Sequence, residues 1–230
     1  MSSRRSPLHL TYPGQSLLSA GFYALIRALA GWAFVVLYRA RGFGAEHVPE
    51  TGACLIASNH QSHLDPPLVS SGVRFRAIHF VAKAELFESR WFGWVIRTLR
   101  AVPIRLDGAS DVTAVREILG RLEIGAAVLI FPEGARTLTG EMSEFQRGVW
   151  LLMKRAKCPV VPCAVEGCYE AFPRGTGFPK LWGKRVAVAY GKAITHEELL
   201  ALGPDEALKR LAAEIEALRM GLRKKLVASS

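Results

Sequence analysis

A histidine and an aspartate five residues apart, His60 and Asp65, are the side chains in this sequence best suited to acid–base chemistry. Imidazole is the only side chain whose unperturbed pKa lies near neutrality. A carboxylate bonded to one ring nitrogen fixes the tautomer and leaves the other nitrogen free to take a proton. Five residues span roughly 140° around a helix, so the pair cannot share one helix face. The segment must turn, and Pro66 and Pro67 predict a helix start directly after it.

A second candidate group, the side chains of Glu133 and Arg136 with Gly134 between them, follows the apolar run 126–131. Gly134 lets the backbone turn at little steric cost, so a carboxylate and a guanidinium are presented at the carboxyl end of a predicted strand. Open α/β sheets bind ligands at that edge, and the planar guanidinium pairs with two phosphate oxygens at once. The structural alternative is a local ion pair between Glu133 and Arg136.

Two further basic residues, Lys83 and Arg105, each follow a short apolar stretch. Taken alone, Lys83 is equally well explained by an ion pair with Glu85, and Arg105 by a solvated strand end. A metal site is not expected, because His60, His63 and Asp65 lack a further ligand at a matching spacing.

The elements that would position these side chains alternate between apolar runs and helical stretches. Strands are predicted at 53–58, 77–82, 126–131, 159–166 and 186–190, and helices at 85–99, 111–123 and 144–157. A final helix is predicted to start at Pro204, with a packing stripe formed by Leu208, Leu211, Ile215, Leu218 and Leu222. This alternation predicts an α/β fold, with a mostly parallel, mixed sheet flanked by helices.

The N-terminal part is different, because the run from Leu17 to Tyr38 is almost wholly apolar. It is long enough to cross a bilayer core of roughly 30 Å, but Arg27 at its midpoint would cost about 2.5–3.5 kcal/mol there. A helical segment lying in one leaflet, with Arg27 reaching the headgroups, fits better than a span. A buried helix packed on the domain is the other alternative. We therefore expect a membrane-associating segment at 1–41 and a second domain at 42–230.

The charge of the chain favours an anionic partner. The formal net charge is +10, residues 1–45 hold no acidic residue, and the sequence closes on Arg219, Arg223, Lys224 and Lys225. Basic ends beside apolar segments favour an anionic membrane surface over nucleic acid, for which no recognition motif is present. The four cysteines contain no C-x-x-C pair, so we expect reduced thiols and a location on the cytoplasmic face of the cell membrane.

Four stretches in order resemble motifs of the glycerolipid acyltransferase family, which is typified by 1-acylglycerol-3-phosphate acyltransferase. The first three are Asn59-His60 through Asp65, the segment from Lys83 to Arg105, and Phe131 to Thr137; the fourth is Val160-Val161-Pro162-Cys163. Phe145-Gln146-Arg147-Gly148 is similar to another family stretch, and the matches together cover about residues 55–166. The chain departs from the family at Leu106-Asp107, where many members carry a second basic residue, and at Ala135, where Thr is usual.

The resemblance implies transfer of a fatty acyl group from acyl-CoA or acyl-ACP to a lysophospholipid hydroxyl, with 1-acylglycerol-3-phosphate as the first choice of acceptor. His60 would be the general base and Asp65 its orienter. Arg136 and Arg105 would hold the phosphate, and Glu133 would position Arg136 or bond the glycerol. Three further positions of the matched motifs, Lys83, Gly134 and Asn59, are expected at the substrate.

The partners implied are membrane lipids, the lysophospholipid, and acyl-CoA or acyl carrier protein, with no bound cofactor. Three alternatives remain open: another acceptor such as a lyso-ornithine lipid, a non-catalytic lipid-binding protein of the same fold, and a phospholipase. The intact His60 and Asp65 pair argues against a pure binder. The absence of a G-x-S-x-G sequence argues against a serine esterase.

Overall fold

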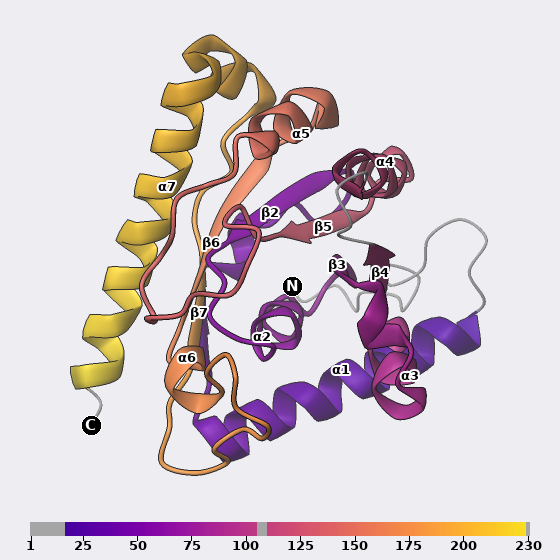
Figure 1. Cartoon of the computed structure of the whole chain (residues 1–230), viewed down its shortest axis with the longest axis vertical. Helices are drawn as coiled ribbons and strands as arrows, with labels where there is room; N and C mark the ends of the chain where they lie inside the picture. Colours follow the sequence, from indigo (N-terminus) through magenta and orange to yellow (C-terminus); the bar gives the residue numbers. More distant parts are fainter. Residues whose placement is uncertain (1–16, 105–109, 229–230) are drawn as a thin grey trace, which may run out of the picture.

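The fold is built on one seven-stranded sheet, seen in a computed structural model that describes residues 17–104 and 110–228 (Figure 1). The strands are β1 (Arg41–Phe43), β2 (Cys54–Ser58), β3 (Ile78–Lys83), β4 (Ala101–Ile104), β5 (Ala127–Ile130), β6 (Val160–Glu166) and β7 (Ala187–Tyr190). They lie in the order β1-β7-β6-β2-β5-β3-β4. All neighbours are parallel except β6 and β7, so the predicted mostly parallel, mixed sheet is confirmed.

Helices cover both faces of the sheet (Figure 1). One face carries α1 (Leu17–Tyr38), α2 (Asp65–Gly72), α3 (Arg90–Thr98) and the short α6 (Cys168–Ala171), while the other carries α4 (Ser110–Glu123), α5 (Gly148–Ala156) and α7 (His196–Ala228). Two 3-10 helices, η2 (Ala45–His47) and η3 (Ala84–Phe87), complete the described elements. Along β2, Cys54 and Ile56 face the first layer, and Leu55 and Ala57 face the second. This alternation buries the strand on both sides, as expected for a central strand of a parallel sheet.

The predicted packing stripe of the last helix is confirmed. Leu211, Ile215 and Leu222 are buried against the sheet, and Leu208 and Leu218 are partly buried beside them. The helix also begins earlier than predicted: α7 starts at His196, and Gly203 (φ 73°, ψ 178°) interrupts it just before Pro204. Pro204 therefore begins the second of two helical segments.

Two predicted helices have different boundaries in the structure. The stretch 85–99 divides into η3 and α3, because the chain folds back so tightly that a Cβ on Gly93 would lie 2.4 Å from the Phe87 carbonyl oxygen. The stretch 144–157 becomes helical only at Gly148, because the Gln146 N–H donates to the Pro132 carbonyl instead (2.8 Å). The three-residue strand β1 was not predicted.

The apolar helix α1 runs along the domain beneath α2 and α3 (Figure 1). A Cβ on Gly31 would lie only 3.4 Å from the Ser71 Cβ, which shows how closely α1 approaches α2. Among the described helices, α1 is long and apolar enough to cross a membrane over Ala20–Tyr38. Several apolar side chains on its outer face are exposed, and this suggests association with a membrane. The proposed division into 1–41 and 42–230 stays a prediction.

The prediction that Arg27 reaches lipid headgroups is wrong. Its guanidinium donates to the carbonyl oxygens of Val73 (2.6 Å), Arg74 (2.9 Å) and Arg76 (3.2 Å). These carbonyls follow the end of α2, where the backbone has left the helical hydrogen-bonding pattern. The charge in the middle of α1 is therefore used to attach this helix to the domain.

Candidate active site

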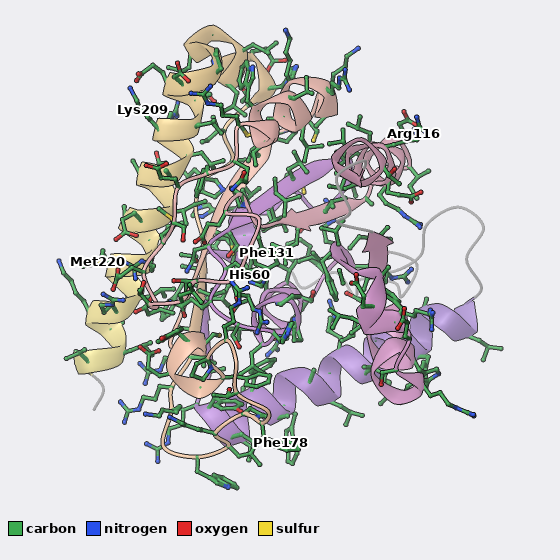
Figure 2. The ribbon with its side chains drawn as sticks, in the orientation of Figure 1. His60, Arg116, Phe131, Phe178, Lys209 and Met220 are labelled. Carbon is green, nitrogen blue, oxygen red and sulfur yellow. The ribbon has the colours of Figure 1, made fainter. Side chains whose placement is uncertain are left out.

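The carboxyl ends of the parallel strands bring the predicted site residues to one edge of the sheet. β2 ends at Ser58 and leads into Asn59 and His60, while the neighbouring β5 ends at Ile130 and leads into Phe131. Figure 2 shows His60 and Phe131 adjacent near the centre of the molecule. The site is thus made where two adjacent strands end, as in other open α/β sheets.

His60 and Asp65 form the predicted pair. The His60 Nδ1 lies 2.8 Å from the Asp65 Oδ2, and the aspartate is fully buried whereas 16% of the histidine side chain is exposed. Because a carboxylate only accepts, Nδ1 carries the proton and Nε2 presents a lone pair. The geometry is that of a base held by its orienting carboxylate.

The turn predicted between the two residues is held by the same carboxylate. The Asp65 Oδ2 also accepts the backbone N–H groups of Gln61 (2.6 Å) and Ser62 (2.7 Å). Asp65 is the first residue of α2, but its side chain binds N–H groups that precede the helix and does not cap it. The backbone N–H groups of Gln61 and Ser62 are therefore not available as donors to an oxyanion.

The imidazole is fixed from a second side by Phe131, the residue that follows β5. The Phe131 ring stacks on the His60 ring with centroids 3.8 Å apart and an interplanar angle of 14°. The two loops are also joined by their backbones, since the Thr137 N–H donates to the His60 carbonyl (2.8 Å). The ring plane is thus set by packing as well as by the carboxylate.

Glu133 joins the two loops and does not position Arg136 as predicted. Its Oε1 accepts the His60 N–H and its Oε2 accepts the Ser143 N–H, both at 2.7 Å. Burial raises the pKa of the Glu133 carboxyl, and the hydrogen bonds from Ser143 and His60 oppose that rise. No ion pair joins Glu133 to Arg136 in the described part of the chain, so the local ion-pair alternative is not realised either.

Asn59 is a structural residue in this arrangement. Its amide donates to the Val165 carbonyl (3.0 Å) and accepts the Val165 N–H (2.8 Å), and its side chain is buried. The predicted contact with substrate does not fit this burial. Asn59 instead ties the end of β2 to β6, which fixes the residue directly before His60.

The predicted backbone turn at Gly134 is confirmed, because this residue has a left-handed backbone conformation with φ of +74°. A Cβ at this position would also lie 3.1 Å from the Gln146 Cγ. The turn continues to Arg136, whose guanidinium is half-buried and makes no hydrogen bond or ion pair with any residue that the structure describes. A guanidinium that has no partner among the described residues, on the loop joined to His60, is suited to hold an anionic substrate.

A second arginine, Arg174, was not predicted and lies next to Arg136. Its Nη1 donates to the Arg136 carbonyl (3.4 Å). Burial, followed by repulsion from Arg174, lowers the pKa of Arg136, and attraction to Asp65 opposes this. Burial, with Arg136 as the next cause, lowers the pKa of His63 to about 4, so His63 is neutral at pH 7. The two guanidinium groups are therefore the positive charges of this part of the site.

Lys83 and Arg105 complete the predicted set. Lys83 is the last residue of β3, at the same edge of the sheet as His60, and Arg105 with Leu106 and Asp107 lies outside the described residues. Within the described ranges, no cluster of three or more His, Cys, Asp or Glu side chains could hold a metal ion.

Comparison with known proteins identifies the family. The family model described as "Acyltransferase" matches residues 40–166, which is more than half of the chain. The chain belongs to the acyltransferase family. This match includes the His60 and Asp65 pair and the loop from Phe131 to Arg136.

Two curated relatives show how much of this chain's sequence is similar to that of known proteins. It is 36% identical over 144 residues to a 1-acyl-sn-glycerol-3-phosphate acyltransferase of Pseudomonas aeruginosa, which covers 61% of this chain and 52% of that one. It is 32% identical over 136 residues to a chloroplastic 1-acyl-sn-glycerol-3-phosphate acyltransferase of Brassica napus, covering 58% of this chain and 39% of that one. The matched stretch thus spans about half or less of either relative.

The fold of this family member also matches a solved structure. The crystal structure of the 1-acyl-sn-glycerophosphate acyltransferase PlsC from Thermotoga maritima superimposes with a TM-score of 0.72. The match covers 88% of this chain and 78% of that one at 24% sequence identity. At this identity the likeness establishes the fold.

Arg174 could have been suspected from the sequence only by its neighbours. It stands in Phe172-Pro173-Arg174-Gly175, where a proline and a glycine mark a turn, but nothing in that pattern indicates a site. Its placement depends on the chain after β6 returning over the loop that holds Arg136, which is a property of the tertiary fold.

Proposed function

We propose that this protein transfers a fatty acyl group from an acyl thioester, acyl-CoA or acyl-ACP, to the free hydroxyl of 1-acylglycerol-3-phosphate, giving phosphatidate. The observation that carries the proposal is the 2.8 Å contact between the His60 Nδ1 and the buried Asp65 Oδ2. It supplies a base with a fixed tautomer, whose free nitrogen is Nε2. A hydroxyl is a poor nucleophile until such a base takes its proton.

In the proposed reaction the acceptor hydroxyl oxygen bonds to the thioester carbonyl carbon while the His60 Nε2 takes its proton. The carbonyl electron pair moves onto oxygen and forms a tetrahedral intermediate. When this intermediate collapses, the carbon–sulfur bond breaks and the departing thiolate receives the proton from the imidazolium. Asp65 holds the ring and stabilises its positive charge throughout these steps.

The burial of the nucleophilic side chains supports direct transfer without an acyl-enzyme. All four cysteines, Cys54, Cys158, Cys163 and Cys168, are free and buried. Burial raises the pKa of Cys54 and of Cys158 to about 11, so these thiols stay protonated at neutral pH. The two serines nearest to His60 in sequence, Ser58 and Ser62, are both fully buried, and Ser62 donates to the Phe172 carbonyl (2.8 Å).

The charge of the site supports an acceptor that carries a phosphate. Arg136 and Arg174 are adjacent, and Arg136 has no carboxylate partner among the described residues. A phosphate bound between them would relieve their mutual repulsion and place the glycerol hydroxyl beside His60, which turns binding energy into orientation. The two curated relatives are named for this acceptor.

The proposed location is the cytoplasmic face of the membrane. Exposed apolar side chains along α1 support contact with lipid, and the free cysteines are in keeping with a reducing compartment. The acyl donors of the proposed reaction, acyl-CoA and acyl-ACP, would be met on that side.

The test is acyl transfer from radiolabelled acyl-CoA to lysophosphatidate in detergent micelles. We expect His60→Ala to lose at least about a hundredfold in kcat, in line with the typical contribution of a general base. We expect Arg136→Ala to raise the KM for lysophosphatidate more than tenfold, because a charge-assisted contact to phosphate is lost. The matched control is Arg116→Ala on α4, which Figure 2 places far from His60 and which should behave as wild type.

Two outcomes would contradict the proposal in different ways. Full activity of His60→Ala, with an unchanged melting temperature, would refute the general base. Transfer to a lyso-ornithine lipid but not to lysophosphatidate would keep the mechanism and refute the acceptor.

A further inference from the structure

The segment between α6 and β7 has the composition of a membrane contact. Residues 172–186 contain four basic residues and no acidic residue. Three large apolar side chains in it are exposed, and the most exposed are Phe178 (88%) and Trp182 (69%), with Leu181 between them. Exposed aromatic and basic side chains in alternation are typical of segments at a membrane–water interface.

This segment lies beside the end of α1. The Val186 N–H donates to the Tyr38 carbonyl, and the Arg41 N–H donates to the Val186 carbonyl, both at 3.2 Å. Figures 1 and 2 show α1 and Phe178 on the same side of the molecule. The exposed outer face of α1, which includes Trp32 (66%), therefore continues into the 172–186 segment.

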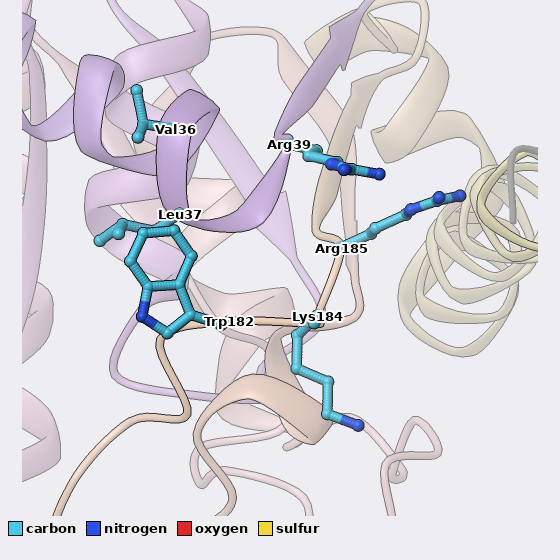
Figure 3. Close-up of a pocket in the computed structure, with 7 residues that line it drawn as sticks. Val36, Leu37, Arg39, Trp182, Lys184 and Arg185 are labelled. Carbon is cyan, nitrogen blue, oxygen red and sulfur yellow. The ribbon is translucent and has the colours of Figure 1, made fainter.

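A cavity of about 290 Å³ lies where the two elements meet (Figure 3). Its apolar wall is formed by Val36 and Leu37 of α1 and by the indole of Trp182 (Figure 3). The basic part of its lining is formed by Arg39, Lys184 and Arg185. None of the predicted catalytic or substrate-binding residues lines this cavity.

The basic side chains of the cavity have no anionic partner among the residues that the structure describes. Arg39 and Lys184 make no hydrogen bond or ion pair with any residue in the described ranges, and Arg185 makes one long contact, from Nη1 to the Leu226 carbonyl (3.5 Å). Figure 3 shows the guanidinium groups of Arg39 and Arg185 extending in the same direction. Like charges that gather without a carboxylate are favourable only when an anion joins them.

We propose that the 172–186 segment docks on the bilayer beside α1 and that this cavity binds the phosphate headgroup of an anionic phospholipid. The headgroup phosphate meets Arg39, Lys184 and Arg185, and the adjoining acyl chain lies against Trp182, Val36 and Leu37. The site is separate from the phosphate position at Arg136. It extends the proposed function, because it holds the protein on the surface that contains the acceptor lipid.

An acyl chain alone would leave the three cations unpaired, and a soluble phosphate would leave the apolar wall exposed. An anionic phospholipid satisfies both parts of the lining. Each basic residue near an anionic membrane surface contributes roughly a fivefold increase in partitioning, and this contribution falls with salt because the Debye length is only about 10 Å at 0.1 M. Trp182 and Phe178 contribute to any bilayer, whatever its charge.

The test is flotation of the full-length protein with vesicles of phosphatidylcholine alone, and of phosphatidylcholine with about one third phosphatidylglycerol, at low and high salt. The double variant Arg39→Gln/Lys184→Gln should lose roughly 25-fold in partitioning to anionic vesicles and little to neutral ones. The variant Phe178→Ala/Trp182→Ala should lose partitioning to both. The matched charge control is Arg116→Gln/Lys154→Gln, on α4 and α5 of the opposite layer, and it should lose much less.

A second measurement places the lipid in the cavity. Phosphatidylglycerol brominated in its acyl chains should quench tryptophan fluorescence in wild type by more than in Trp182→Phe, and the difference reports Trp182 alone. Equal partitioning of wild type and Arg39→Gln/Lys184→Gln to anionic vesicles at low salt, or quenching that is the same in Trp182→Phe, would overturn the proposal.

The vesicle experiments contain no acyl donor, so they are independent of the proposed reaction. A wild type that partitions as described but transfers no acyl group in micelles would refute the reaction and leave the headgroup site standing. Acyl transfer in micelles by a wild type that shows no preference for anionic vesicles would refute the headgroup site and leave the reaction standing.

Discussion

At the scale of single residues, one carboxylate oxygen organises the turn between His60 and Asp65. The Asp65 Oδ2 receives the His60 Nδ1 and two backbone N–H groups, whereas the buried Oδ1 has no hydrogen-bond partner among the described residues. All the hydrogen bonds that the Asp65 carboxylate accepts go to Oδ2, the oxygen that faces His60. The aspartate therefore shapes the turn and orients the His60 imidazole, which is the proposed base, with the same atom.

Asp65→Asn separates these two roles. An amide oxygen at the Oδ2 position can still accept the backbone N–H groups of Gln61 and Ser62, so we expect the fold to be retained. Without the carboxylate charge the imidazolium formed in the reaction loses its stabilisation, and kcat should fall by roughly 10²- to 10⁴-fold. Steady-state kinetics and thermal unfolding would check this expectation.

The KM for lysophosphatidate is the control in that experiment, because Asp65 is not proposed to touch the acceptor. A variant with normal kcat would show that His60 needs no carboxylate. If Asp65→Asn loses its fold along with its activity, Asp65→Glu can be used in its place. Asp65→Glu keeps the carboxylate charge but displaces it, so its kcat should also be low.

At this scale the sequence predicted the residues better than their partners. The spacing of His60 and Asp65 was informative because both lie on one turn, whereas Glu133 reaches a backbone N–H 73 positions away. Asn59 and Arg174 depend in the same way on contacts between distant segments. Local spacing cannot reveal which of several polar side chains at a strand end will face the substrate and which will be buried.

At the scale of elements, α7 is connected to the turn that holds His60 and Asp65 through buried charges. Arg219, only 2% exposed, pairs with Glu216, Glu141 and Glu166, and the Arg223 Nε donates to the Glu166 Oε1 (2.6 Å). The Glu166 Oε2 in turn accepts the amide of Gln61 (3.1 Å), the residue after His60. The last helix therefore helps to hold the position of His60, the proposed base.

Arg219→Met removes the centre of this network while keeping a similar length of side chain. Because it leaves buried carboxylates with fewer partners, we expect the free energy of unfolding to fall by about 3–5 kcal/mol. We also expect kcat to fall, by less than in Asp65→Asn, with the KM unchanged. Urea unfolding and steady-state kinetics measure both effects.

The matched control on the same helix is Arg210→Met, whose pair with Glu198 is exposed on both sides. Such pairs contribute about 1 kcal/mol or less, so this variant should resemble wild type. If both variants behaved alike, the buried network would have no special role. Partial recovery of kcat in Arg219→Lys would separate a role in positioning from a loss of fold.

The predicted element boundaries were right where they depend on local sequence. They were wrong where backbone N–H groups donate to a neighbouring loop and not within a helix. The central strands are found within a residue or so of their predicted positions, because their apolar runs are buried on both faces. The start of α5 was placed four residues too early, because Ser143 and Gln146 give their N–H groups to the loop of Glu133 and Pro132. The short β1 has no apolar run to indicate it.

At the scale of the whole molecule, α1 has one face buried against the domain and one exposed face. Tyr23, Phe34 and Tyr38 are buried against the domain, and Arg27 bonds to carbonyl groups after α2. Leu29 and Trp32 are exposed on the other side. This division fits the prediction of a helix that lies along a membrane surface while attached to the domain, and that arrangement stays a prediction.

Two variants of α1 test this arrangement, because each affects one face. Leu29→Ser/Trp32→Ser should lower partitioning to vesicles roughly 10- to 100-fold without changing urea unfolding, since both side chains are exposed in the free protein. Arg27→Met should lower the free energy of unfolding by about 1–3 kcal/mol, because three carbonyl groups lose a charged donor, and should leave partitioning unchanged.

In a free-standing spanning helix, loss of the Arg27 charge would instead strengthen membrane binding and leave the free energy of unfolding unaltered. That pattern of results would replace the surface arrangement with a span.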